Sequence, residues 1–382
     1  MNAPSDSQVN SGKATQPLYV LTHEEAVYSA TISPDGTRIV TACGDSALLW
    51  DAASGQPLGL PMRHEKSVRK AIFSPDGTKI GTVSEVVTLS LRGGVTHKGS
   101  VLLWDAATGK PVGGPMHHWD RESVASASFS PDGTKIVTAS ADGTAQLWDA
   151  LNGKALNKPM RHAASVFTAI YATLRFGGGL GSNMRLSAAV FGASFSPDGT
   201  KIVTASDDNT ARLWDAASGK ALGRLRHKDG VYIASFSPDG TQVVTVSRDK
   251  SVWLWDAASG KAAGEPLIHE AGIQSANFRP DGAKIVTASG KTALLWDVAK
   301  GKALCEAMRH EATVLSASFS PDGTKILTSS ADTTARLWDA ASGKALCEPM
   351  RHEATVLSAS FSPDGTRIVT ASKDKKARLW EV

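Results

Sequence analysis

The chain has 382 residues and a formal net charge of +4, with 41% hydrophobic and 20% charged residues. This balance is typical of a folded globular protein and excludes disordered and collagen-like chains. No apolar run approaches the ~18 residues of a membrane-spanning helix, and residues 1–17 lack the apolar core of a signal peptide. The three cysteines are too few for a disulfide framework. We therefore expect a cytoplasmic protein.

Tryptophan is over-represented, with ten Trp against four Tyr. Eight of the ten recur along the chain, at intervals of 41 or 42 residues over its second half, and seven of these eight are followed by Asp. They are Trp50, Trp104, Trp148, Trp214, Trp255, Trp296, Trp338 and Trp380. Each is preceded by a Ser-Pro-Asp-Gly or Arg-Pro-Asp-Gly turn, and self-similarity at this period indicates a repeat architecture.

The last repeat shows what one unit contains. A short apolar segment ending at Met350 is followed by His352 and by three strand-like segments at 356–361, 367–372 and 377–380. Tight polar turns separate the segments, and the pattern contains no helix signal. Four strands of ~5 residues cannot bury both faces of a sheet, so neighbouring sheets must stack, and eight sheets around an axis form a β-propeller.

The ~42-residue period, the repeated His, the Ser-Pro-Asp-Gly turn and the Trp-Asp dipeptide together resemble WD40 repeats over residues 17–382. The resemblance implies an all-β fold, a single eight-bladed propeller with four-stranded antiparallel blades, after a disordered tail at 1–16. The uniform repeats are similar to those of bacterial WD40 proteins, by analogy only.

Eight Trp-bearing strands are followed by only seven outer strands. Since residues 16–23 match 56–64 in composition and position, we expect the N-terminal strand to complete the last blade and so remove the exposed sheet edges. Seven blades with a stray repeat is the alternative.

Polar residues also recur before the tryptophans. A Thr precedes Trp by ten residues and an Asp by six in repeats 3, 4, 5, 7 and 8, and repeat 1 keeps the Thr-to-Asp spacing. The resemblance implies that His, Thr, Asp and Trp form a structural tetrad in which His donates to Asp and the hydroxyl bridges His to Trp. The clearest sets are His23, Thr41, Asp45, Trp50; His227, Thr245, Asp249, Trp255; His310, Thr328, Asp332, Trp338; and His352, Thr370, Asp374, Trp380.

A catalytic set of residues occurs once in a chain, whereas the His, Thr, Asp and Trp set recurs from repeat to repeat. We therefore interpret this set as structural. Repeat 6 has Lys291 in the Asp position and repeat 2 has no Asp that fits. We therefore expect blades 2 and 6 to be less rigid.

All large irregularities fall on one face of the expected propeller. Repeat 2 has an extended hairpin at 85–100, repeat 3 has about two extra residues, and repeat 4 has an insertion of about 24 residues after His162. Loops on a rigid scaffold concentrate binding residues, although neutral drift would also produce such insertions. The candidates here are Trp119 and Arg121, and on the hairpins Arg92, His97, Arg175, Phe176 and Arg185.

The same face includes the residue that follows the first Val or Ile of each innermost strand. Tyr, Trp and Arg are favoured interface anchors, while partial burial at a strand entrance is the alternative reading. The candidate partner-binding residues at this rim are Tyr28, Arg69, Phe191, Tyr232, Gln274, Leu315 and Leu357, with Ala125 at the eighth position and Arg248 nearby.

No catalytic, cofactor or metal motif emerges. The Gly-rich stretch at 177–181 lacks the Lys-Ser/Thr of a phosphate loop, and His117 and His118 have no Cys or carboxylate at ligand spacing. Cys43 is expected to be a small buried residue, and Cys305 and Cys347 need not pair. The innermost strands offer small hydroxyls, and we expect no titratable group in the central channel.

These observations favour a non-enzymatic scaffold, adaptor or sensor subunit that binds another protein, an effector acting in trans, and no membrane. Two alternatives remain open: a nucleic-acid-binding propeller, for which the dispersed positive charge is weak support, and an enzyme with its site in the channel.

Overall fold

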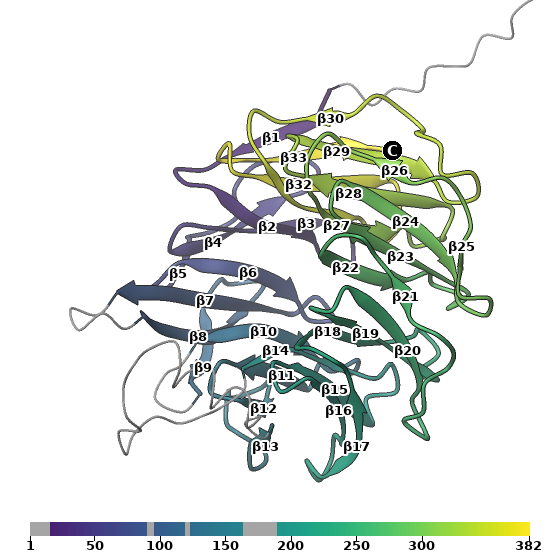
Figure 1. Ribbon diagram of the computed structural model, residues 1–382. Helices are drawn as coiled ribbons and strands as arrows, with labels where there is room; N and C mark the ends of the chain where they lie inside the picture. The colour runs from purple at the N-terminus through teal and green to yellow at the C-terminus, as the bar shows by residue number, and fades with distance from the viewer. Residues whose placement is uncertain (1–15, 90–94, 119–122, 163–188) are drawn as a thin grey trace, which may run out of the picture.

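The computed structural model describes residues 16–89, 95–118, 123–162 and 189–382. Over these residues the chain forms strands and turns and no helix. The strands form eight antiparallel sheets arranged around one axis (Figure 1), each with its neighbours on both sides. The eight-bladed all-β propeller predicted from the repeats is therefore confirmed.

Each blade is a meander with four strand positions, and the innermost strands share the same length of six residues. The innermost strands are β2 (Val27–Ile32), β6 (Val68–Phe73), β10 (Val124–Phe129), β14 (Val190–Phe195), β18 (Val231–Phe236), β22 (Ile273–Phe278), β27 (Val314–Phe319) and β31 (Val356–Phe361). The second strands are β3 (Arg38–Cys43), β7 (Lys79–Leu89), β11 (Lys135–Ser140), β15 (Lys201–Ser206), β19 (Gln242–Ser247), β23 (Lys284–Ser289), β28 (Lys325–Ser330) and β32 (Arg367–Ser372).

The third strands end in the repeated Trp and its acidic neighbour, and the outer strands are mostly short. The third strands are β4 (Ser46–Asp51), β8 (Val95–Asp105), β12 (Thr144–Asp149), β16 (Thr210–Asp215), β20 (Ser251–Asp256), β24 (Thr292–Asp297), β29 (Thr334–Asp339) and β33 (Lys376–Glu381). The outer strands are β5 (Met62–Arg63), β9 (Pro111–Met116), β13 (Met160–Arg161), β17 (Ala221–Arg226), β21 (Leu267–Ile268), β25 (Lys302–Ala303) with β26 (Met308–Arg309), β30 (Met350–Arg351) and β1 (Tyr19–Thr22).

The ring closes through the N-terminal strand. β1 pairs antiparallel with β33, from Tyr19 opposite Leu379 to Thr22 opposite Lys376. Figure 1 shows this pair where the two ends of the colour scale meet. The closure expected from the match between residues 16–23 and 56–64 is thus present, and β1 supplies the outer strand of the last blade.

The core lies between blades rather than within them. Val203 and Ala205 of β15, for example, pack against Val231, Val243 and Trp255 of the next blade. Equivalent clusters fill the other blade boundaries, and their β-branched residues are almost fully buried. A single repeat therefore cannot bury its apolar surface alone, which accounts for the stacking that the repeat pattern required.

The Pro-Asp-Gly turns between the first and second strands are pinned by their own side chains. Asp35 accepts hydrogen bonds from the Ser33 hydroxyl at 2.5 Å and from the Thr37 amide at 3.0 Å. These donors lower the pKa of Asp35 to about 2. Gly36, with φ 72°, occupies the left-handed region that the turn requires. The face that carries these turns is nearly uniform from blade to blade.

Blade 2 departs from this uniformity on the opposite face. The pairing of β7 with β8 continues from Lys79 opposite Asp105 to Leu89 opposite Val95, so the backbone forms the extended hairpin expected at 85–100. Its tip at 90–94, the extra residues of repeat 3 at 119–122 and the insertion at 163–188 lie outside the described residues, as does the tail at 1–15.

Candidate functional site: a ring of bulged residues around the channel

Every innermost strand contains a β-bulge at its second residue. In β2, Val27 lies opposite Cys43 and Ser29 opposite Ala42, which leaves Tyr28 without a partner in the ladder. The same register shift occurs in the other seven innermost strands. The bulged residues, here called the bulge ring, are Tyr28, Arg69, Ala125, Phe191, Tyr232, Gln274, Leu315 and Leu357. A bulge re-aims the side chain that it carries.

The bulge ring is the set of rim positions that the sequence singled out. In repeat 4, where the sequence left the register open, Val190 begins the strand and Phe191 is the bulged residue. Arg69 and Gln274 are exposed, whereas Tyr28, Leu315 and Leu357 are partly buried.

Two cation–π contacts join neighbouring residues of this face. The guanidinium carbon of Arg69 lies 4.2 Å from the centre of the Tyr28 ring, across the boundary between blades 1 and 2. Arg248, on the turn after β19, lies 5.3 Å from the centre of the Phe191 ring. Such contacts stabilise by roughly 0.5–1 kcal/mol at exposed sites, so they orient the two arginines more than they hold the fold.

Arg248 is also held by a carboxylate. Its Nη1 atom lies 2.6 Å from Oδ1 of Asp207. Burial raises the pKa of Asp207, and the charge of Arg248 opposes that rise. Arg248 therefore presents a partly neutralised cation, while no ion pair within the described residues involves Arg69.

Tyr232 plays a different part from Tyr28. Its hydroxyl donates to the main-chain oxygen of Ile273 in the next blade, and burial raises its pKa to about 12. Its phenol group thus ties blade 5 to blade 6, and the residue is partly buried.

Arg92, Trp119, Arg121, Arg175, Phe176 and Arg185 lie outside the described residues. His97 lies on β8, with its backbone opposite Val87.

The His–Thr–Trp part of the expected tetrads is formed in all eight blades. The indole N–H of each repeated Trp donates to a Thr hydroxyl at 2.7–2.9 Å. The same hydroxyl lies 2.6–2.8 Å from Nε2 of the repeat's His. Burial lowers the pKa of His23, His64, His227 and His352 to about 4, so these imidazoles are neutral at pH 7.

The Asp contact is not formed in two of the four sets predicted from sequence. His310 and His352 place Nδ1 at 2.8 and 2.9 Å from Asp332 and Asp374. In contrast, the buried Nδ1 atoms of His23 and His227 have no hydrogen-bond partner. The contacts expected for Asp45 and Asp249 were therefore wrong.

The residue two positions before the Trp differs between the two groups of blades. Blades 4, 7 and 8, which form the short His–Asp bond, have Arg212, Arg336 and Arg378 there. Blade 3 has Gln146, and its His118–Asp142 distance is 3.4 Å. Blades 1 and 5 have Leu48 and Trp253. The Arg holds the carboxylate over the imidazole; without it, Asp45 lies 3.5 Å from Arg63 instead.

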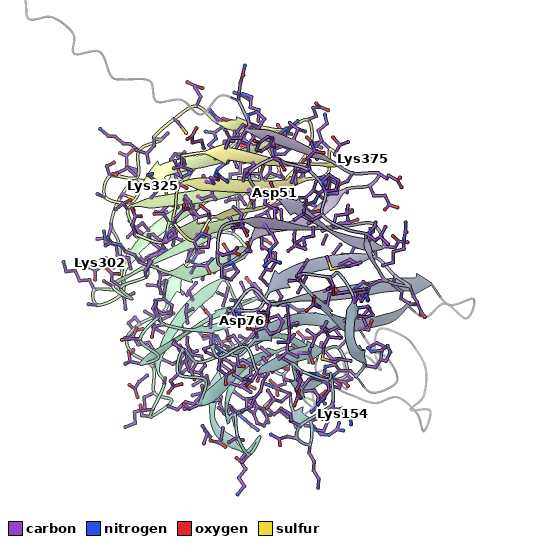
Figure 2. The ribbon with its side chains drawn as sticks, turned by 180° about the vertical axis from the view of Figure 1, so that it is seen from behind. Asp51, Asp76, Lys154, Lys302, Lys325 and Lys375 are labelled. Carbon is purple, nitrogen blue, oxygen red and sulfur yellow. The ribbon has the colours of Figure 1, made fainter. Side chains whose placement is uncertain are left out.

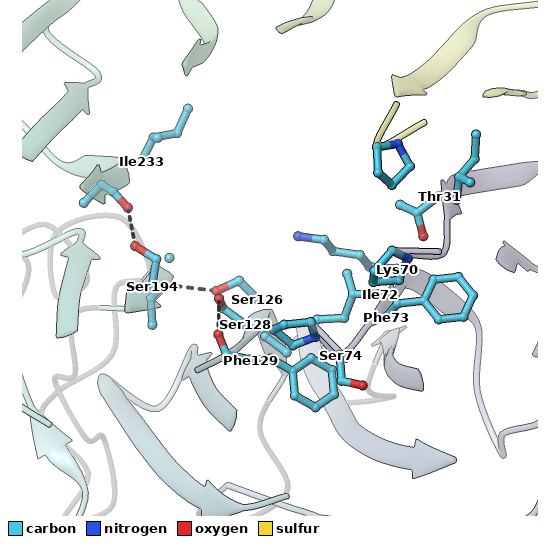
Figure 3. A pocket seen from close by; sticks show the side chains of 18 of the residues that line it. Thr31, Lys70, Ile72, Phe73, Ser74, Ser126, Ser128, Phe129, Ser194 and Ile233 are labelled. Carbon is cyan, nitrogen blue, oxygen red and sulfur yellow. Dashed lines mark hydrogen bonds between the residues drawn. The ribbon is translucent and has the colours of Figure 1, made fainter. Parts of the chain in front are cut away.

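The central channel contains a titratable side chain, contrary to the sequence-based expectation. A cavity of about 870 Å³ is lined by the innermost strands of blades 1 to 5, by the turns after β2 and β6, and by Pro363 of the last blade. Lys70 of β6 extends into it (Figure 3), in the strand position held by Ser in five other blades. The sequence already contained this exception: in the segment VRKAIF, residues 68–73, Lys70 stands where the innermost strands of five other blades have Ser.

The described part of the chain lacks two features that would point to a metal or membrane role. It contains no group of three or more His, Cys, Asp or Glu side chains that could hold a metal ion. It also contains no helix that is both long and apolar enough to cross a membrane. Cys43, Cys305 and Cys347 are free thiols, and only Cys43 is fully buried.

Comparison with known proteins identifies the repeats. The family model described as WD domain, G-beta repeat matches residues 15–51, 109–149, 183–215, 219–256, 267–297, 302–339 and 344–381. These seven matches leave out the stretch with the β7–β8 hairpin. No curated protein matches the chain.

Among solved structures, the chain is similar to the crystal structure of the computationally designed Ika8 protein (crystal packing No.1 in P63). The TM-score is 0.75 at 20% identity, over 97% of this chain and 100% of that chain. At this identity the likeness concerns the fold alone.

Proposed function

The chain belongs to the WD40 repeat family, whose propellers generally act as scaffolds for protein interaction, and on that premise we propose that it binds another protein through the face that carries the bulge ring. The chain then acts as a non-enzymatic adaptor or sensor subunit, and its partner supplies any effector activity. A cytoplasmic location stays a prediction from composition.

The observation that carries this proposal is the diversity of the bulge ring on an otherwise repetitive scaffold. The opposite face repeats the same Pro-Asp-Gly turn in every blade. The bulge ring instead presents Tyr, Arg, Ala, Phe, Tyr, Gln, Leu and Leu from one structural position. Specific recognition needs unlike groups at defined places, and aromatic and Arg side chains dominate binding energy at interfaces.

The β7–β8 hairpin extends the same face. The β7–β8 hairpin continues the ladder beyond the length of other blades, next to Arg69. We include Trp119, Arg121 and the hairpin residues Arg92, His97, Arg175, Phe176 and Arg185 in the proposed surface because their segments are inserted on this side of the repeats.

The proposal is tested by charge reversal on the two faces. Arg69→Glu reverses an exposed charge of the bulge ring, and Lys154→Glu reverses an exposed charge at the periphery of Figure 2, on the loop after β12. A third variant lacks residues 172–187. Tagged chains are expressed in the native host and their partners quantified by mass spectrometry.

We expect a partner that copurifies with the wild type and Lys154→Glu and is depleted with Arg69→Glu or the deletion. Equal recovery of every partner by all four chains would refute the assignment of this face.

Salt dependence separates a protein partner from nucleic acid. Lys154, Lys302, Lys325 and Lys375 lie around the outside of the molecule in Figure 2, so positive charge is dispersed rather than gathered in one stripe. A protein partner predicts a shallow dependence of affinity on salt, whereas a nucleic acid predicts a steep one.

A further inference from the structure

Lys70 is a single cation at a level of the channel where the other blades present small or uncharged side chains. The equivalent residues are Ser29, Ser126, Gly192, Ile233, Ser275, Ser316 and Ser358. Its ammonium forms no hydrogen bond or ion pair with any residue that the structure describes. The side chain is accessible to solvent, while the surrounding walls desolvate the ammonium and lower its pKa.

The walls around Lys70 are mainly apolar and contain no acidic group among the described lining residues. Ile72, Phe129 and Ile233 contribute apolar surface. Figure 3 shows the amine of Lys70 reaching into the open centre, with Ser126 and Ser194 to one side of it and Thr31 to the other. A cation among apolar groups is costly unless a counter-ion is present.

Ser126 supplies a second polar group at the same level, one blade away. Its hydroxyl oxygen accepts a hydrogen bond from the amide of Ala193 at 3.2 Å. No acceptor for its own hydrogen is found among the described residues. Ser128 and Ser194, in contrast, donate to main-chain carbonyls. Ser126 is thus free to donate to an acceptor in the channel.

We propose that the channel binds a small organic anion, with an apolar body and one carboxylate or phosphate group, whose charge is bound by Lys70 and Ser126. A volume of about 870 Å³ lies in the range of small-molecule sites, which are apolar with a few placed polar groups. The site adjoins the bulge ring, since Tyr232 also lines the cavity, but its test does not depend on a protein partner.

The site is tested with 1-anilinonaphthalene-8-sulfonate, an organic anion whose fluorescence rises on binding. Its neutral control is N-phenyl-1-naphthylamine, which has the same apolar body without the charge. Lys70→Ser introduces the residue found in five other blades, and Lys70→Met keeps the length of the side chain. Lys110→Ser removes the same charge from an exposed loop of the same blade.

We expect the wild-type chain to bind one molecule of the anionic probe, and Lys110→Ser to bind it with unchanged affinity. The affinity of Lys70→Ser and Lys70→Met for this probe should be about tenfold weaker, as for loss of one charge-assisted hydrogen bond. The neutral probe should bind all variants equally. Octanoate and octyl phosphate should compete with the anionic probe, and the stronger competitor identifies the preferred head group.

Unchanged affinity of either Lys70 variant, equal loss of the neutral probe, or displacement by neither competitor would overturn the proposal. Circular dichroism verifies the fold of each variant. Because two unlike replacements are used, one that fails to fold still leaves the other to decide.

Discussion

Arg378 places Nη1 3.0 Å from Oδ2 of Asp374, the same oxygen that accepts the Nδ1–H of His352 at 2.9 Å. Arg378 is buried, and it thereby fixes the carboxylate over the imidazole. The arrangement recurs with Arg212 and Asp208, at 3.1 Å, and more loosely with Arg336 and Asp332, at 3.8 Å.

The first prediction concerns this Arg. Arg378→Leu, which introduces the residue of blade 1, should lower the free energy of unfolding by about 1–3 kcal/mol because a buried carboxylate loses a partner. Arg336→Leu should cost less because its contact is longer. Urea denaturation of both variants provides the comparison, and an equal loss would show that the contact distance is not what matters.

The second prediction concerns the shared Thr hydroxyl. Thr328→Val leaves the indole N–H of Trp338 and the imidazole of His310 without their buried partner, so it should cost about 2–5 kcal/mol in unfolding free energy. Thr324→Val, in the exposed turn of the same blade, is the matched control and should cost under about 1 kcal/mol. Similar losses in the two variants would argue against the network as a source of stability.

The third prediction concerns acid. Four histidines, three of them buried and His227 partly buried, have pKa values near 4 in the folded chain against 6.5 when unfolded. Between these values the unfolded chain binds more protons, so stability is complete above pH 6.5 and falls as the pH drops toward 4. At pH 5 each histidine costs up to about 2 kcal/mol.

Urea titrations at several pH values measure this slope between pH 7 and 5. His23→Gln removes one titrating group and should make the slope shallower than in the wild type. A wild-type stability that does not change between pH 7 and 5 would contradict the buried neutral state of these side chains.

The fourth prediction concerns local rigidity. Blades 2 and 6 lack the Asp of the tetrad, and in blade 6 Nδ1 of His269 lies 3.3 Å from the main-chain oxygen of Leu267 instead. Their second and third strands should exchange amide hydrogens faster than those of blades 7 and 8. Residues 308–324 and 350–366 are identical in sequence, so peptides must be chosen from 325–330 and 367–372. Equal protection in the four blades would disprove the expectation.

Much of the fold could be predicted because its signals are local and repeated. Eight Trp residues, eight Pro-Asp-Gly turns and the match of residues 16–23 to 56–64 were enough to predict eight blades and their closure. The rim positions could also be found, since each follows the first residue of an innermost strand. The place of Lys70 in the channel could not be predicted, because the strand pattern of one repeat does not show which side chains the eight strands enclose together.

The sequence by itself determined the propeller, because each repeat carries its own turns, strand periods and buried Trp. Only the tertiary structure decided which side chains meet. The short His–Asp contacts of blades 4, 7 and 8 accompany an Arg two residues before the Trp, and the isolation of Lys70 depends on walls from several blades. Such contacts join residues far apart in the chain, and their energies depend on burial and on the orientation of neighbours, which a local pattern does not contain.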